Sequence, residues 1–429
     1  MKSQELILYR NLDHQDLFDQ IAELLSMSRQ EREGARLKSY GCAGQLTELA
    51  ARYGFEGNLW HCFLAFCLAN NENAYSTTCE IAGAVKGTLN ELAAHDFRVL
   101  KGLFDYDIRV LDGDENREGI WTALSAYQAA DGNSKVYNKR IRDQIVALAV
   151  SLEKAEDEGE FACEVTEFYH RFGVGKFGLN KAFRVEDKNG ELGLLPITNI
   201  EHIYLDDIVG YQLQKQKLIE NTEAFLSGRA ANNVLLFGDS GTGKSSSIKA
   251  ILNEYYDRGL RIIEVYKHQF KALSKIQEQV KDRNYKFIIY MDDLSFEESE
   301  LEYKYLKAII EGGLGKKPGN VLIYATSNRR HLIREKFSDK RELDDELHNN
   351  DTVQEKLSLV ARFGVTIYYG SPDKRQFQEI VKALAVRCEL NMPLEELYRS
   401  ANIWELNHGG LSGRTASQFI THLLGKESQ

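Results

Sequence analysis

The sequence predicts an α/β protein in which a parallel sheet fills the second half of the chain and a mainly helical region precedes it. From Asn232 onward, short apolar segments alternate with amphipathic ones, as in a parallel sheet covered by helices on both faces. Before about Glu164, apolar residues recur at helical spacing, for example Ile141, Ile145 and Leu148. A chain of 429 residues with 43% hydrophobic content is long enough for two or three domains.

Four regions are expected along the chain. A mainly helical N-terminal domain should cover residues 1–170, and a glycine-punctuated, strand-like connector should follow over 171–199. The sheet-bearing core should cover 200–370, and a helical lid should close the chain over 371–429. The expected core strands are 234–237, 261–265, 287–291, 321–325 and 365–368.

Charge and hydropathy exclude some classes of function. Residues 1–200 carry a net charge of −9 and residues 201–429 a net charge of −1, so the first half is poorly suited to general nucleic-acid binding. No apolar stretch approaches the roughly 18 residues that a bilayer helix requires, and the first residues do not resemble a secretion signal. We therefore expect a cytoplasmic protein without a membrane partner.

One cluster in the helical half has metal-binding residue types, namely His61, Cys62, Cys67 and Cys79. The cluster contains no CxxC pair, and the five-residue interval between Cys62 and Cys67 places them on different faces of a helix. We expect these residues to be buried in the core and the cysteines to be reduced thiols.

A phosphate-binding loop is predicted between the first core strand and the following helix, because the segment matches GxxxxGK[ST] in full. Its glycines allow backbone N–H groups to surround phosphates, and the helix N-terminus favours anions. Lys244 would reach the β- and γ-phosphates of ATP, and Ser245 would ligate Mg²⁺. A chance glycine-rich turn is the alternative. The loop residues are Gly238, Asp239, Ser240, Gly241, Thr242, Gly243, Lys244 and Ser245.

Two carboxylates follow the third core strand, at the kind of strand end where open α/β sheets bind ligands. Asp292 would hold Mg²⁺, and Asp293 stands where a base that polarises the attacking water is expected. The two residues could instead cap the next helix. Asp293 is shorter than the glutamate most often used, so turnover is expected to be slow. Glu297 is a second candidate base, although a residue that caps or decorates the following helix is the favoured interpretation of it.

Three further polar residues stand at functionally suggestive places. Asn328 follows the fourth core strand and could sense the γ-phosphate, Arg362 lies just before the last strand, and Arg414 lies near a helix start in the lid. Each arginine alone could equally be a surface charge.

Taken in order, Lys244, Asp292, Asn328, Arg362 and Arg414 resemble the Walker A, Walker B, sensor 1, arginine-finger and sensor 2 residues of AAA+ ATPases. The resemblance covers about residues 204–424. It implies a P-loop NTPase sheet of order 5-1-4-3-2, homo-oligomeric rings such as hexamers, and an Arg362 that completes a neighbour's site. It also implies that the adenine of ATP lies near Ile208, Val209, Gly210 and Tyr211.

The sequence further resembles a bacterial AAA+ family known as domain of unknown function 815. The shared strings are Gly-Thr-Gly-Lys-Ser-Ser at 241–246, Asp-Asp-Leu-Ser-Phe-Glu at 292–297 and Tyr-Ala-Thr-Ser-Asn-Arg-Arg-His at 324–331. Upstream strings such as Gly-Asn-Leu-Trp at 57–60 extend the resemblance over most of the chain.

Two uses of ATP stay open at this point. The chain could hydrolyse ATP to remodel or load an unidentified protein or nucleoprotein client, or it could be a nucleotide-gated binding scaffold that turns over rarely. Threading through a pore loop is disfavoured, since no glycine occurs between Gly259 and Asp292. A DNA-associated loader is a further alternative without support: the basic residues from Arg329 to Arg341 could bind nucleic acid, but interleaved acids favour a solvated loop.

Overall fold

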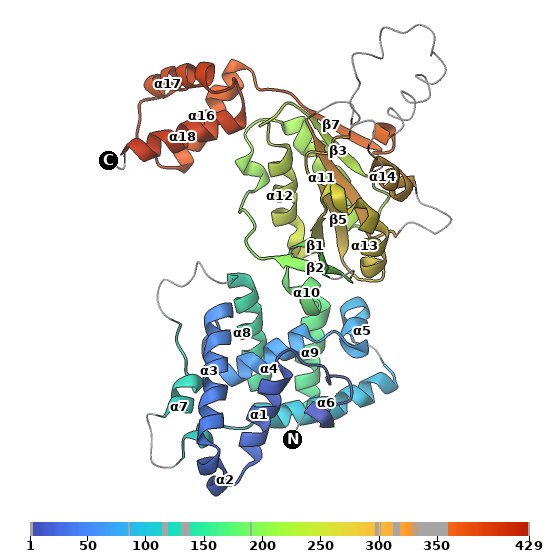
Figure 1. Cartoon of the computed structure of the whole chain (residues 1–429), viewed down its shortest axis with the longest axis vertical. Coiled ribbons are helices and arrows are strands. Elements are labelled where there is room, and N and C mark those ends of the chain that lie inside the picture. The colour runs from blue at the N-terminus through green and yellow to red at the C-terminus, as the bar shows by residue number, and fades with distance from the viewer. Residues whose placement is uncertain are drawn as a thin grey trace. The chain divides into compact units, whose positions relative to one another are not determined.

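The structure is a computed structural model that describes residues 3–84, 86–113, 119–129, 138–188, 191–296, 300, 302–311, 318–328, 332 and 359–427 (Figure 1). The chain divides into two compact units, Met1–Asn180 and Lys181–Gln429. The expected connector at 171–199 is not a separate region. Its first part forms helix α10 (Gly175–Leu179) of the first unit, and its second part forms two strands of the sheet in the second unit.

The described part of the first unit consists of helices, with two short 3₁₀ turns. The α-helices are α1 (Gln15–Ser26), α2 (Arg29–Gly34), α3 (Arg36–Tyr53), α4 (Leu59–Asn70), α5 (Ala74–Ala82), α6 (Thr88–Phe104), α7 (Ile120–Ser125), α8 (Lys139–Lys154), α9 (Glu158–Phe172) and α10.

Helix α4 lies at the centre of this unit, because every residue from Leu59 to Ala69 is buried. A helix that is apolar on all sides can be stable in water only inside a core. Its N-terminus is capped by Asn58, whose side chain accepts hydrogen bonds from the backbone N–H groups of Trp60 and His61. The N-terminal segment is attached to the same core by the buried carboxylate of Asp96, which accepts from the N–H groups of residues 7, 8 and 9.

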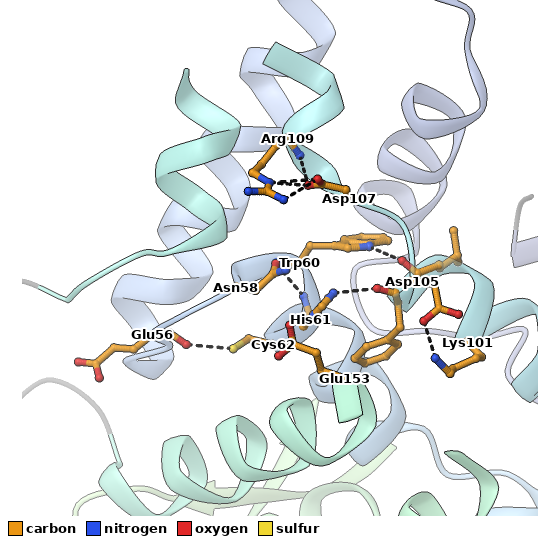
Figure 2. A network of polar contacts seen from close by, with 12 residues as sticks. Glu56, Asn58, Trp60, His61, Cys62, Lys101, Asp105, Asp107, Arg109 and Glu153 are labelled. Carbon is orange, nitrogen blue, oxygen red and sulfur yellow. Dashed lines mark hydrogen bonds and ion pairs between the residues drawn. The ribbon is translucent and has the colours of Figure 1, made fainter. Parts of the chain in front are cut away.

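The histidine and cysteines that might have bound a metal are core residues, and His61, Cys62 and Cys67 are bonded to backbone carbonyls. His61 Nε2 donates to the carbonyl of Phe104 at 2.9 Å. Cys62 Sγ donates to the carbonyl of Glu56 at 3.4 Å, and Figure 2 shows both His61 and Cys62. Cys67 Sγ donates to Asp13, and burial raises the pKa of the Cys62 thiol to about 12. In the described ranges, no three His, Cys, Asp or Glu residues are grouped as metal ligands would be.

The second unit is built on a seven-stranded sheet. Its strands are β1 (Ala182–Lys188), β2 (Glu191–Ile197), β3 (Val234–Gly238), β4 (Leu260–Glu264), β5 (Lys286–Met291), β6 (Val321–Ser327) and β7 (Val365–Tyr369). The spatial order is β2-β1-β4-β5-β6-β3-β7. Read from the β7 edge, the last five strands of the chain stand in the order fifth, first, fourth, third, second.

The expected order 5-1-4-3-2 left out the hairpin of β1 and β2, which extends the sheet beyond β4. β1 pairs in parallel with β4, with Ala182 opposite Ile262, and pairs antiparallel with β2. β2 is an edge strand in which Pro196 pairs with Phe183. Proline has no N–H group, so β2 lacks one donor that a central strand would use.

Helices cover both faces of this sheet. Alternate strand residues such as Leu236, Ile288 and Tyr324 pack against α11 (Gln212–Leu226) and α12 (Lys244–Tyr255). The opposite face is covered by α13 (Leu273–Val280) and α14 (Glu302–Glu311) (Figure 1). The central strands are buried on both sides, which explains their continuous apolar runs.

Three helices form the lid: α16 (Lys374–Arg387), α17 (Leu394–Asn407) and α18 (Gly413–Glu427). They share a small core that includes Phe377, Val381 and Phe419, and Val209 of the sheet-bearing core packs against it. No helix in the part of the chain that the structure describes is both long and apolar enough to cross a membrane.

The buried His61 should make the stability of the helical unit depend on pH. Burial is the main reason that its pKa lies below 6.5, although Glu153, whose Oε1 lies 3.7 Å from Nδ1, acts in the opposite direction. The neutral imidazole is therefore the stable form, and its contribution is lost as the pH falls from 6.5 toward the folded pKa. His61→Gln keeps a donor for Phe104 but does not titrate. The free energy of unfolding of this variant should therefore fall less steeply below pH 6.5 than that of the wild type. For one proton, the difference in slope is at most about 1.4 kcal/mol per pH unit.

The measurement is chemical denaturation followed from pH 7.5 to 5.5. His95→Gln is the matched control, since His95 Nε2 also contacts a backbone carbonyl, that of Glu5, but lies on the surface. Equal pH slopes for the wild type and His61→Gln would contradict the prediction.

Candidate functional site

The predicted phosphate loop lies between β3 and α12. β3 ends at Gly238 and α12 begins at Lys244, so residues 239–243 form the connecting loop. Gly238 has a φ of 135°, and a Cβ atom added there would lie 2.1 Å from the carbonyl oxygen of Tyr369 in β7. Only glycine therefore allows the loop to pass so close to the neighbouring strand.

Lys244 lies almost fully buried at the base of this loop, with 6% of its surface exposed. Its Nζ donates to the carbonyls of Gly238 at 3.1 Å and Asp239 at 2.6 Å, and to Asn328 Oδ1 at 3.0 Å. Burial lowers the pKa of the ammonium, and the nearby carboxylates of Asp239, Asp293 and Asp292 counteract that effect. The loop therefore holds a localised positive charge where the phosphates of a nucleotide would lie.

A hydroxyl and a carboxylate meet beside Lys244. Ser245 Oγ donates to Asp292 Oδ1 at 2.7 Å, and Thr326 Oγ1 donates to the same oxygen at 2.5 Å. Burial pushes the pKa of Asp292 upward, but the hydrogen bonds, of which that from Thr326 has the largest effect, bring it below the ordinary value. A hydroxyl next to an ionised carboxylate is a donor set that suits Mg²⁺ completed by phosphate oxygens and water.

Asp293 and Asn328 are hydrogen-bonded to each other at the same end of the sheet. Asn328 Nδ2 donates to Asp293 Oδ1 at 2.7 Å, while its Oδ1 accepts from Lys244, so one amide links the cation to the carboxylate. Asp293 has a φ of 47°, in the left-handed region that non-glycine residues seldom occupy. Such strain is found where neighbouring groups hold the backbone in place, and it often marks a functional site.

Arg414 of the lid contacts the phosphate loop. Its backbone N–H donates to the carbonyl of Gly241 at 3.2 Å, and its guanidinium reaches Ser240 Oγ at 3.5 Å. The sensor-2 candidate therefore lies against the phosphate loop.

These groups line a cavity of about 690 Å³ between the core and the lid. Its lining also includes Ile208, Val209 and Tyr211 together with Ile380 and Leu384 of α16. A cavity of this size, lined by both charged and apolar side chains, suits a nucleoside triphosphate. Gly210, which was also expected near the adenine, is not among the lining residues.

Asp239 points away from this cavity and toward the start of the lid. Its Oδ2 accepts from the backbone N–H of Ser371 at 2.7 Å and from the Ser371 hydroxyl at 2.8 Å, and these bonds lower its pKa. Tyr211 acts nearby: its hydroxyl donates to the carbonyl of Gly370, and burial raises its pKa to about 12. The phosphate loop is thus bonded to the segment that leads from β7 into the lid.

Arg362 lies just before β7 and does not line the cavity. Its role as an arginine finger therefore stays a prediction. Glu297 and the basic residues between Arg329 and Arg341 lie outside the described residues.

The sequence analysis missed three contributors to the site. Thr326 bonds both aspartates, Ser371 bonds Asp239, and Arg387 of the lid pairs with Asp207 at 2.8 Å on the cavity wall. A signal existed for Thr326 alone, because it stands two residues before Asn328 at the end of a strand expected beside the aspartates.

The fold and the site together define a class of protein. The defining features are the strand order, the loop around Lys244, the carboxylates after β5, Asn328 after β6 and the three-helix lid. The second unit has the AAA+ fold of P-loop NTPases.

Within that class, the chain belongs to the family described as "Protein of unknown function (DUF815)", whose sequence model matches residues 179–427. This membership agrees with the family expected from the sequence strings. A comparison with curated proteins found no match.

Among solved structures, two examples are similar to part of the chain. One is the Holliday junction branch migration motor RuvB of Thermotoga maritima, at 16% identity and a TM-score of 0.34 over 51% of this chain. The chain spans 63% of that structure's length. The other is the FIGL-1 AAA domain in complex with ADP, at 20% identity and a TM-score of 0.35 over 52% of this chain and 73% of that one. Likenesses this weak carry no argument about activity.

Removing the charge of Lys244 should abolish nucleotide binding without unfolding the chain. Lys244→Ala should weaken ATP binding by about two orders of magnitude or more in calorimetry, since the buried cation is the main attraction for the phosphates. Lys217→Ala, an exposed position on α11, is the control and should bind like the wild type. Wild-type affinity in Lys244→Ala would refute the assignment of the loop.

Proposed function

We propose that this protein is a Mg²⁺-dependent ATPase that uses the cavity described above. The observation that carries the proposal is a group of residues that line that cavity: Asn328 bonds both Lys244 and Asp293, and Thr326 connects Asp293 to Asp292. Phosphoryl transfer depends mainly on positioning and on electrostatic stabilisation, and this group supplies a cation, a metal-binding carboxylate, a base and a polar amide within reach of one another.

Each residue then has a role in binding or in chemistry. Lys244 contacts the β- and γ-phosphates, backbone groups of 239–243 surround them, and Ser245 and Asp292 hold Mg²⁺. The metal, when bound, neutralises charge that develops on the phosphate oxygens. Asp293 accepts the proton of the attacking water, Asn328 orients that water, and Arg414 reaches the phosphates from the lid. The adenine lies against Ile208 and Val209.

The contact between Asp293 and Asn328 has a consequence for the rate. Asp293 Oδ1 is already an acceptor for Asn328, and a γ-phosphate would compete for both Asn328 and Lys244. Asp293 therefore becomes free to act as the base when the γ-phosphate binds Asn328 and Lys244. This contact and the short aspartate side chain favour slow turnover, so a nucleotide-gated scaffold is the second candidate function.

Assembly is the next part of the proposal. Arg362 is not among the residues that line the cavity of its own chain, which supports a role between protomers. We assign it to the γ-phosphate of a neighbouring protomer in a homo-oligomeric ring. The energy of ATP would then drive remodelling or loading of a protein client, or of a nucleoprotein client as the alternative.

The catalytic base can be separated from nucleotide binding. Asp293→Asn keeps Asp292, so ATP affinity should stay within about threefold of wild type while turnover falls by about 10² to 10⁴, the usual contribution of a general base. Steady-state ATPase assays and calorimetry measure the two effects. If Asp293→Asn hydrolyses normally and Glu297→Gln does not, the base is Glu297.

The arginine acting between protomers can be tested by mixing variants. Arg362→Ala should bind ATP normally and hydrolyse it about 10³ to 10⁵ times more slowly, the range known for arginine fingers. A mixture of Arg362→Ala, which has an intact phosphate loop, with Lys244→Ala, which has an intact arginine, should recover activity at shared interfaces. An inactive mixture of variants that demonstrably co-assemble, or full wild-type activity in a strict monomer, would rule out the role.

A further inference from the structure

One residue of the neighbouring strand is hydrogen-bonded to three residues of the turn that follows β5. Thr326 is the sixth residue of β6 and only 2% exposed. Its hydroxyl donates to Asp292 Oδ1 at 2.5 Å and accepts from the backbone N–H of Asp293 at 2.9 Å. Its backbone carbonyl accepts from the N–H of Leu294 at 2.7 Å. A single residue thus contacts three consecutive residues of the turn.

The directions of these bonds are fixed by chemistry. A hydroxyl has one proton, and an ionised carboxylate can only accept, so the Thr326 proton points to Asp292 and its lone pair receives the Asp293 N–H. The same hydroxyl therefore sets the rotation of the Asp292 carboxylate and the position of the Asp293 backbone.

The conformation of Asp293 shows why such a contact is needed. A φ of 47° is unfavourable for an aspartate and persists only where neighbouring groups impose it. The end of β6 contacts all three residues of this turn: Thr326 bonds residues 292–294, and Ser327 Oγ donates to the carbonyl of Leu294 at 2.8 Å. Ser245 and Asn328 add side-chain bonds to Asp292 and Asp293. Thr326 lines the cavity, but its hydroxyl already donates to Asp292 and accepts from the Asp293 N–H.

We propose that Thr326 is a positioning residue that orients the metal-binding carboxylate of Asp292 and the base Asp293 through one shared hydroxyl. This inference rests on the proposed ATPase function and adds to it a residue whose hydroxyl acts through the two aspartates. Outer partners of metal ligands usually contribute about 10- to 100-fold to metal affinity or activity.

Two substitutions separate the hydroxyl from the packing of the side chain. Thr326→Val keeps the shape and removes the hydroxyl, whereas Thr326→Ser keeps the hydroxyl and removes a methyl group. Thr326→Val should lower kcat by about 10- to 100-fold and raise the Mg²⁺ concentration for half-maximal rate, and Thr326→Ser should stay within about threefold of wild type in both.

Control measurements of ATP affinity test the binding site independently of catalysis. ATP affinity in EDTA should be the same in wild type, Thr326→Val and Thr326→Ser, which shows that the phosphate loop is folded. The gain in ATP affinity on adding Mg²⁺ should be smaller in Thr326→Val alone. In an Asp293→Asn background, Thr326→Val should lower kcat by less than it does in the wild type, because residues that act together are not additive.

The outcomes distinguish this inference from the proposed function. A wild type that binds ATP with Mg²⁺ but does not hydrolyse it overturns the ATPase proposal, and the Mg²⁺-dependent affinity of the variants still tests Thr326. Wild-type kcat and Mg²⁺ dependence in Thr326→Val overturn the positioning role. Equal losses in Thr326→Ser and Thr326→Val also overturn it, since they assign the effect to packing of the methyl group.

Discussion

The site depends on the position of β6 between β3 and β5. Parallel pairing places Leu236 opposite Thr326 on one side and Met291 opposite Ala325 on the other, so the three strands end at the same edge. The loop with Lys244, the turn with the aspartates and the polar end of β6 therefore meet within hydrogen-bond distance. Any change of one residue in this register would turn the side chains of β6 to opposite faces and separate the three groups.

This arrangement stabilises buried charged groups that would be unfavourable without their partners. Lys244 is almost fully buried, and an isolated ammonium in that position would be strongly unfavourable. Two backbone carbonyls and the Asn328 side chain accept hydrogen bonds from its ammonium group. Three carboxylates lie near enough to counteract the lowering of its pKa. The same groups would have to exchange partners when a triphosphate enters, so the site is built from contacts that a ligand can replace.

The sequence predicted the parts of the fold and site that depend on local pattern. The phosphate loop, the strand before Asp292 and the strand before Asn328 are each contained in a short string, and all three lie where that pattern implied. The hairpin of β1 and β2 could not be assigned to the sheet, because its membership depends on pairing between Ala182 and Ile262, far apart in sequence. The roles of Thr326 and Ser371 likewise depend on side chains that meet only after folding.

The edge strand β2 has a consequence for self-association. Sheets with exposed edges can recruit strands from other molecules, which leads to aggregation, and proteins often block this with proline. Pro196 removes a donor from β2, and Gln279 of α13 already bonds the carbonyl of Leu192 in the same strand. Addition of an eighth strand would therefore lack part of its hydrogen-bond ladder. The extra hairpin thus lengthens the sheet while ending it with a strand that is a poor template for fibril-like growth.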